Sequence, residues 1–230
     1  MRAPPAAGLL LIPALLLGVG VPLAAQEGTD DDRHDADHAE HAVQGGGTLP
    51  EGWSARVDGR GGTADVQVVP MGKGMHVTLG PALILYREDT RGDGPFHTLA
   101  TFTQTTKTPH PEGYGLFYGG QDLDGAGQKY TYFLVRADGS YLIKRRNGKE
   151  TTDISKGWVP SAAVQKLNGK GTATNLLEID HKRDPSQVVF MVNGQPVHTL
   201  AADATEVDGI VGIRANHHLD LHVDGFDVHR

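Results

Sequence analysis

The sequence of 230 residues contains no cysteine, which excludes disulfide bonds and anchoring through a lipid-modified cysteine. That absence does not identify a compartment, because proteins without disulfides occur in every compartment. Short catalytic and cofactor signatures are also absent: there is no nucleophile elbow, no phosphate-binding loop and no dinucleotide fingerprint. Positive charge is scarce, with 21 Lys and Arg against 28 Asp and Glu and a net charge of −7. Nucleic acid binding requires a basic surface, so we do not expect it here.

Apolar runs are equally scarce, and the one long run lies near the start of the sequence. It extends from Leu9 to Val21, follows Arg2 and gives way to small residues before Gln26. The run is too short for a transmembrane helix, but its position and flanks are typical of a secretory signal peptide. We therefore predict a signal peptide over residues 1–25, export to the periplasm or the extracellular space, and no membrane span.

Residues 26–47 hold seven acidic residues, one arginine and three histidines, and they end in three glycines. The tract has no periodicity and few large apolar side chains, which predicts an acidic, disordered linker. Its histidines (His34, His38 and His41) could bind a divalent metal weakly, and a solvated spacer is the alternative. Residues 48–230 suffice for one core of sandwich size, so we expect a single β-sandwich domain there.

Short β segments fill the chain from Trp53 to His229, and no long helical period interrupts them. Asp-Gly and Asn-Gly pairs separate the segments, and the 31 glycines suit a chain with so many turns. Many short strands joined by such turns are typical of an antiparallel sandwich. The sequence therefore predicts an all-β fold.

The clearest pair of strands is Tyr130–Arg136 and Tyr141–Arg146, which flank Ala137, Asp138 and Gly139. A loop of two residues and a loop of three residues are both possible, and they give different registers. The two-residue loop mixes apolar and charged side chains on both faces. The three-residue loop, with Gly139 in the left-handed conformation, sorts them by face. Sorting by face fixes register, so we predict the three-residue loop.

With this register the hairpin has an apolar face and an aromatic and basic face. The apolar face contains Phe133, Val135, Tyr141 and Ile143, and the other contains Tyr130, Tyr132, Leu134, Leu142, Lys144 and Arg146. We expect the aromatic and basic face to be half buried at most. Trp158, farther along the chain, is expected in the core rather than at the rim of a site.

Six segments of the chain resemble one superfamily. They are GYGLFYGGQDL (113–123), the hairpin over 130–148, GWVPSAAV (157–164), NLLEIDH (175–181), the hairpin VVFMVNGQPV (188–197) and the closing run DGIVGIRANHHLDLHVDGFDV (208–228). The order of these segments and their turn and core residues resemble those of the concanavalin A-like lectin/glucanase superfamily. Within it, they look closest to laminin-G-like modules and bacterial 3-keto-disaccharide hydrolase-like domains. The resemblance implies a jelly-roll sandwich with a carbohydrate-related function. No matched motif is catalytic, and one fold hosts many functions.

The aromatic and basic face of the hairpin suits carbohydrate. Sugars are bound by flat rings against their C–H faces and by a few fixed polar groups. Tyr130, Tyr132, Lys144 and Arg146 supply both, so we predict that a saccharide or glycoconjugate binds at these residues on the concave sheet face. The alternative is that they only cover the sheet. An exported carbohydrate-binding module is thus one functional hypothesis, and a structural or assembly domain without a small ligand is another.

A glycoside hydrolase of the 3-keto-disaccharide hydrolase-like type is a further hypothesis. Glu178 and Asp180 resemble part of the E-x-D-x-x-E strand of retaining β-glucanases, whose chemistry requires two carboxyl groups roughly 5 Å apart. Arg183 stands where that pattern has its third acid, so the match is incomplete. Asp220 is the other candidate for a catalytic carboxylate.

The stretch from Asn216 to His222 is the densest group of potential metal ligands. On a strand, His218, Asp220 and His222 share one face, and His217, Leu219, Leu221 and Val223 share the other. Three such side chains could hold a divalent cation, calcium or zinc, which is the one cofactor that the sequence suggests. The alternative is the solvent face of an edge strand whose other face is buried.

Overall fold

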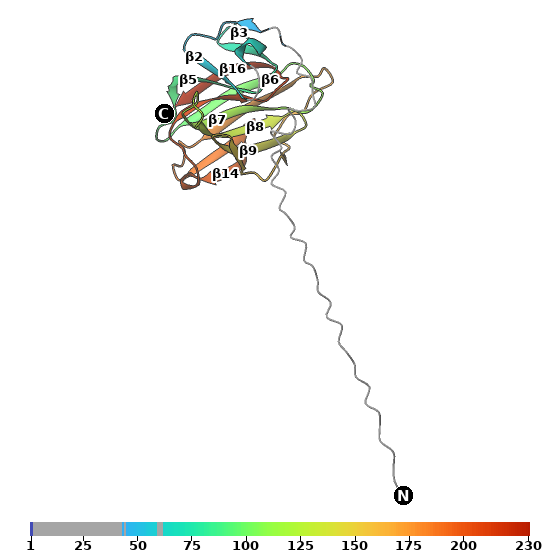
Figure 1. Ribbon diagram of the computed structural model, residues 1–230, viewed down its shortest axis with the longest axis vertical. Coiled ribbons are helices and arrows are strands. Elements are labelled where there is room, and N and C mark those ends of the chain that lie inside the picture. The colour runs from blue at the N-terminus through green and yellow to red at the C-terminus, as the bar shows by residue number, and fades with distance from the viewer. Residues whose placement is uncertain (2–42, 44, 59–61) are drawn as a thin grey trace. The chain divides into compact units, whose positions relative to one another are not determined.

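The computed structural model describes Met1, Val43 and residues 45–58 and 62–230 (Figure 1). The chain divides into two units, and the second, which begins at His38, contains all the strands below. The predicted signal peptide and the three histidines of the predicted linker lie outside the described residues. A search of those residues for a helix long and apolar enough to span a membrane finds none.

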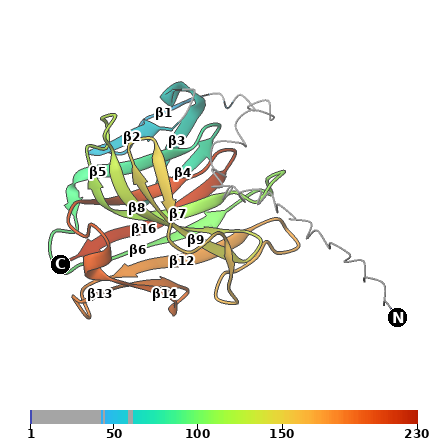
Figure 2. The ribbon, with the colours of Figure 1, turned by 60° about the horizontal axis from the view of Figure 1, so that its bottom comes forward.

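Two sheets lie face to face and form a sandwich (Figure 2). The first, called the β6 sheet, contains in spatial order β1 (Gly46–Gly47), β3 (Val66–Met71), β4 (Gly74–Leu79), β16 (Asp220–His229), β6 (His97–Gln104), β12 (Ala173–Asp180), β13 (Gln187–Val192) and β14 (Gln195–Ala201). The second, called the β8 sheet, contains β10 (Glu150–Asp153), β9 (Ser140–Asn147), β8 (Lys129–Arg136), β7 (Gly113–Gln121), β15 (Ile210–Ala215), β5 (Leu83–Arg91) and β2 (Trp53–Val57), with β11 (Val159–Pro160) paired to β9.

Antiparallel pairing dominates both sheets. Within the described residues only β1 and β3 run parallel, and the helical elements are two short 3₁₀ turns, η1 (Thr63–Asp65) and η2 (Ala202–Ala204). The predicted all-β antiparallel sandwich is therefore confirmed.

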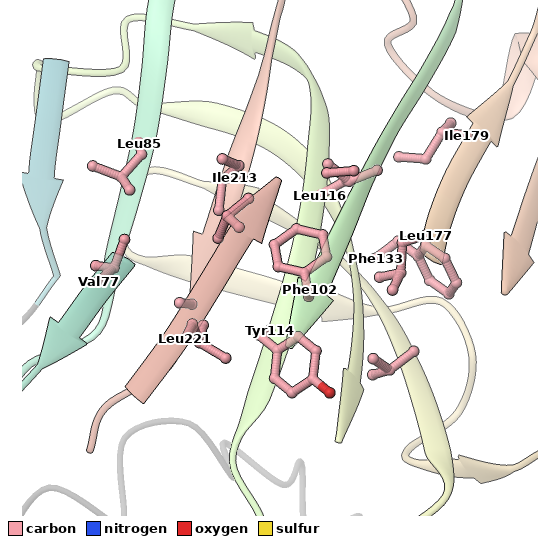
Figure 3. Close-up of a cluster of buried hydrophobic side chains, with 14 of the residues drawn as sticks. Val77, Leu85, Phe102, Tyr114, Leu116, Phe133, Leu177, Ile179, Ile213 and Leu221 are labelled. Atoms are coloured by element: carbon pink, nitrogen blue, oxygen red, sulfur yellow. The ribbon is translucent and has the colours of Figure 1, made fainter. Parts of the chain in front are cut away.

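Alternating side chains build the core between the sheets. In β6, for example, every second side chain is buried, which is the period expected of a strand with one face toward a core. Side chains from both sheets meet there, among them Phe102 and Leu177 from the β6 sheet and Tyr114 and Phe133 from the β8 sheet (Figure 3). Complete burial of one side chain of this size stabilises the fold by about 1.5–3 kcal/mol.

The central hairpin has the predicted three-residue loop. Arg136 lies opposite Ser140, and Gly139 has a φ of 93°, the left-handed conformation that a glycine adopts without strain. The Asp138 carboxylate accepts hydrogen bonds from the Ser140 amide and hydroxyl and pairs with Arg136, which holds the turn closed. The apolar face of the hairpin packs into the core between the sheets, as expected from this register.

The aromatic and basic face lies on the opposite side of the β8 sheet, turned away from the β6 sheet; we call this side the outer face. The prediction that this face is half buried at most is wrong, because Tyr132 is 0% exposed, Tyr130 2% and Lys144 6%. Neighbouring strands place large side chains beside the tyrosines, and the β7–β8 connection adds another. Together they form a second apolar cluster of Ile84, Tyr86, Phe117, Leu123, Tyr130, Tyr132, Leu134 and Ile210.

Candidate functional site

The buried arginine Arg214 is the centre of the polar groups on the outer face. Its neighbours on β15, Ile213 and Ala215, point into the core between the sheets, so alternation turns Arg214 outward. One guanidinium nitrogen, Nη1, donates to Asp58 Oδ2 at 2.6 Å and lies 2.7 Å from the Tyr130 hydroxyl. The guanidinium carbon lies 4.6 Å from the ring centroid of Tyr132. A cation over an aromatic ring in this position is stabilised by the charge distribution of the ring.

Asp58 links three strands across the outer face. It follows β2, and its Oδ2 accepts from Arg214 of β15 and lies 3.3 Å from Nη1 of Arg146 in β9. Burial by itself raises the pKa of this carboxyl, but the two guanidinium groups outweigh burial and hold the pKa below its ordinary value. Asp58 is therefore a carboxylate at neutral pH, and it holds the Arg214 guanidinium over the tyrosine rings and pairs with Arg146.

Gly212 leaves room for the aromatic rings that lie beneath Arg214 and Asp58. A Cβ at Gly212 would lie 2.5 Å from Cε1 of Phe117, so a side chain at this position and the present place of that ring exclude each other. The Phe117 ring packs against Tyr130 at 5.1 Å, and Tyr130 against Tyr132 at 5.8 Å. The sequence therefore produces a continuous aromatic surface under Arg214.

Three buried acceptor oxygens on the outer face have no hydrogen-bond partner within the described part of the chain: Asp58 Oδ1, Gln128 Oε1 and Asn216 Oδ1. Gln128 precedes β8, and its side chain hydrogen-bonds to Asp58, which also lowers the pKa of that carboxyl. Asn216 follows Arg214 by two residues, and its amide continues the pairing with β7 at Gly113. An unpaired buried acceptor costs about 1–3 kcal/mol, so such atoms are rare in a protein interior and call for an explanation.

A hollow of about 290 Å³ lies at the ends of β8 and β9, and Tyr130 and Arg146 both line it. Arg145 Nη2 donates to the Ala204 carbonyl in η2, which forms part of its wall. Small-molecule sites start at about 300 Å³, so this hollow is at the lower limit of that range. Of the four predicted ligand-binding residues, the structure thus places two at a hollow, and the other two, Tyr132 and Lys144, farther along the same face.

Trp158 belongs to the outer face and not to the core between the sheets, contrary to the prediction. It is partly buried against the outer apolar cluster, and the Arg136 guanidinium lies 4.4 Å from its ring centroid. Gly113 permits this position, because a Cβ there would lie 2.8 Å from the indole ring. The aromatic surface thus extends from Tyr130 along β8 to Trp158.

The predicted catalytic carboxylates lie on the β6 sheet, away from these groups. Glu178 Oε2 is 3.0 Å from His97 Nε2, and Asp220 Oδ1 is 2.5 Å from His76 Nε2. Asp180 Oδ1 accepts from the backbone amides of the two residues that begin the turn after β12. Each of these carboxylates therefore has a protein partner that links or ends strands.

The predicted metal ligands do not share a strand face. β16 begins at Asp220, and His218 lies before it in a turn with a φ of 56°. The ring of His218 packs against His217 at 5.1 Å, whereas the ring of His222 stacks with His76 at 6.4 Å. Among the described residues, no group of three or more His, Cys, Asp or Glu side chains is arranged to hold a metal ion. The left-handed turn is the physical reason, because it breaks the alternation on which the prediction depended.

Asp58 and Arg214 are not among the predicted site residues. A signal for Arg214 was present: it is the one charged residue in the apolar strand Ile210–Ala215, and its neighbours are apolar. No local signal pointed to Asp58, because its partner Arg214 is 156 positions away.

A larger hollow, of about 640 Å³, is lined by other residues, among them Trp53, Phe226, Lys73 and Arg87. The rings of Trp53 and Phe226 pack there at 5.3 Å. None of the predicted site residues lines this hollow, whereas Tyr130 and Arg146 line the smaller one. We therefore place the candidate site on the outer face of the β8 sheet.

The fold has relatives among solved structures, although no protein-family model and no curated protein matches the chain. The carbohydrate binding module CBM66 from Bacillus subtilis matches with a TM-score of 0.55 and 9% identity, over 78% of this chain and 96% of that one. A Bacillus subtilis protein of unknown function with a galectin-like fold matches with a TM-score of 0.53 and 11% identity, over 77% and 88%. Such low identities establish the fold alone, and that fold is the predicted concanavalin A-like jelly-roll sandwich.

Proposed function

We propose that this protein is an exported carbohydrate-binding module and that its ligand lies against the outer face of the β8 sheet. The observation that carries the proposal is the combination of three buried acceptors without partners and fixed cationic donors above one aromatic surface. The donors are Arg146 and Arg214, and the aromatic surface consists of Tyr130, Tyr132 and Phe117.

The chemistry of a sugar ring fits these groups. A hydroxyl group both donates and accepts, so hydroxyls can accept from guanidinium nitrogens and donate to Asp58 Oδ1, Gln128 Oε1 and Asn216 Oδ1. These three oxygens are buried, so the ligand has to displace the side chains that cover them in order to reach them. Tyr130 lines the hollow at the ends of β8 and β9 with the small part of its side chain that is exposed, and the C–H face of the sugar ring packs against that part. A ligand with hydroxyls around an apolar face would thus relieve the cost of the unpaired acceptors.

The comparisons support this proposal. One of the similar structures is described as a carbohydrate binding module. Export is proposed on the predicted signal peptide over residues 1–25, so the saccharide would be met in the periplasm or outside the cell.

A binding screen tests the proposal. Oligosaccharides of glucose, galactose, mannose, fructose and uronic acids are titrated into the full chain by calorimetry, and thermal unfolding is followed in parallel. A saccharide at about a hundred times its Kd is expected to stabilise the fold by about 2.7 kcal/mol, which raises Tm by several degrees. A screen in which no saccharide binds or raises Tm would overturn the proposal.

Replacing Asn216 by leucine is expected to stabilise the protein and to lower its affinity for the saccharide. Asn216→Leu removes an unpaired buried acceptor without changing side-chain size much, so the free energy of unfolding should rise by about 1 kcal/mol. Loss of one hydrogen bond should raise Kd by about tenfold. Denaturant unfolding and calorimetry measure the two effects.

Gln104→Leu is the matched control for Asn216→Leu. It removes the unpartnered Oε1 of a residue that lies on the β6 sheet, away from the proposed site, so Kd should not change. If Asn216→Leu lowered stability and left Kd unchanged, Asn216 would be a structural residue and not a ligand contact.

A further inference from the structure

The larger hollow, of about 640 Å³, lies beside β2, the edge strand of the β8 sheet, and between residues of β5 and residues of β4 and β16. We call it the edge hollow. It shares no lining residue with the hollow at the ends of β8 and β9. Its volume is within the range of about 300–1,000 Å³ that is usual for small-molecule sites.

Strand β5 brings an ion pair to the edge hollow. The alternation that points Leu83 and Leu85 into the core also points Arg87 and Asp89 to that side of the sheet. Arg87 Nε donates to Asp89 Oδ1 at 2.8 Å, and the two side chains are 37% and 65% exposed. The apolar core therefore stops at Leu85, and accessible charged groups take its place on the wall of the hollow.

A β-bulge in β16 brings an aromatic ring to the same hollow. The pairing of β16 with β6 is interrupted after Asp224, and Gly225 has a φ of 64°. Val223 faces the core, so strict alternation would place Phe226 on the opposite side of the sheet. The bulge shifts the alternation by one residue, and Phe226 lies on the core side, with its ring 5.3 Å from that of Trp53.

The pairing of β16 with β4 also ends at Val223. From that residue on, β16 pairs with β6 alone, and Asp227 and Val228 line the hollow. The Val228 amide donates to the Asp227 carboxylate at 2.8 Å. A second carboxylate thus stands at the hollow beside the aromatic pair.

We infer that the edge hollow is a second saccharide-binding site, separate from the outer face. The choice of a saccharide rests on the proposed function, whereas the site itself does not depend on any group of the outer face. Trp53 and Phe226 form the aromatic wall of the site, and the ion pair of Arg87 with Asp89 forms the polar wall.

The mixture of groups favours a polyhydroxy ligand. A charged ligand is matched by groups of one sign, but the edge hollow carries Lys73 and Arg87 together with Asp89 and Asp227. Hydroxyl groups donate to carboxylates and accept from cations, so a sugar uses both kinds. The Trp53 side chain is partly exposed, and an aromatic ring in such a position packs against the C–H face of a sugar.

Tryptophan fluorescence tests the inference, because the chain has two tryptophans and one of them lines the edge hollow. In the full chain with Trp158→Phe, Trp53 is the single tryptophan. Trisaccharides of glucose, galactose, mannose, fructose and uronic acids are titrated into this variant. At least one is expected to shift the emission of Trp53 to shorter wavelength in a saturable manner, since a sugar on the indole ring displaces water.

Asp89→Ala, made in the Trp158→Phe chain, removes an acceptor from the wall of the site. It is expected to raise the Kd that Trp53 reports by tenfold or more. Asp93→Ala is the matched control. Arg91 Nε donates to Asp93 Oδ2 at 2.7 Å in the same spacing along the chain, but neither residue lines the hollow. Both pairs are exposed, so neither variant should change Tm much, and Asp93→Ala should leave Kd unchanged.

Asn216→Leu separates the two sites, because Asn216 belongs to the outer face. In the Trp158→Phe chain it should leave the Kd reported by Trp53 unchanged. The inference is overturned if Asn216→Leu raises that Kd as much as Asp89→Ala does, or if Asp89→Ala behaves like Asp93→Ala. It is also overturned if calorimetry detects saccharide binding while the emission of Trp53 stays constant, and the proposed function then stands. If no trisaccharide binds by either method, the proposed function fails as well.

Discussion

Arg214→Met is expected to lower the free energy of unfolding by about 3–5 kcal/mol and to abolish saccharide binding. The reason for the loss of stability is that Asp58 stays behind as a buried carboxylate with one weaker guanidinium partner at 3.3 Å. The Tyr130 hydroxyl loses its partner at 2.7 Å, and the ring of Tyr132 loses the cation above it. Denaturant unfolding at neutral pH measures the first effect, and calorimetry with a saccharide from the screen measures the second.

The pH dependence of this loss identifies Asp58 as its cause. In the wild type the pKa of Asp58 is below its ordinary value of 3.8. A carboxyl with a lowered pKa stabilises the folded state above the ordinary value, and this contribution is lost as the pH falls through the lowered value. The difference in stability between wild type and Arg214→Met should therefore be largest at neutral pH and shrink in acid.

A double variant completes the test of the Asp58–Arg214 pair. Asp58→Asn in the Arg214→Met background removes the stranded charge, so it should recover at least half of the lost free energy of unfolding. If the double variant were less stable than Arg214→Met, by the full cost of Asp58→Asn alone, the two residues would act independently and the pair would not organise the outer face.

Phe133→Ala is expected to lower the free energy of unfolding by about 3–5 kcal/mol without changing Kd for the remaining folded protein. Phe133 is fully buried between the sheets, where its ring packs against Phe190 at 5.2 Å and Tyr141 at 6.2 Å. Truncation removes the transfer free energy of the ring and leaves a cavity that the sheets fill only in part. Thermal and denaturant unfolding measure the loss, and calorimetry below the transition measures Kd.

Phe133 lies on the core face of β8, whereas the proposed site lies on the outer face, so the two faces can be tested separately. Phe133→Leu, which leaves a smaller cavity, should cost clearly less than Phe133→Ala. If Phe133→Ala weakened saccharide binding as strongly as Arg214→Met, the ligand would lie between the sheets or at their edge, and the outer face would not be the site.

Local sequence was sufficient to predict the strands and the register of the central hairpin. The Asp138-Gly139 turn and the sorting of apolar side chains in β8 and β9 depend on residues within a few positions of each other. The same local pattern placed Tyr130, Tyr132, Lys144 and Arg146 on one face, which the pairing of β8 with β9 confirms. It could not give their burial, because that depends on side chains from β5, β7 and β15, which reach the hairpin only in the folded sheet.

The sequence by itself thus determined an all-β sandwich, the register of its central hairpin and the aromatic and basic character of one face, since the period of a strand and the chemistry of a turn are local properties. Tertiary structure alone decided that Asp58 meets Arg214 and that Trp158 lies outside the core. It also decided that Asp58 Oδ1, Gln128 Oε1 and Asn216 Oδ1 are buried without a hydrogen-bond partner among the described residues. These features depend on which distant strands become neighbours and which connections cross a sheet face. Long-range packing sets both, and no local pattern in the chain encodes them.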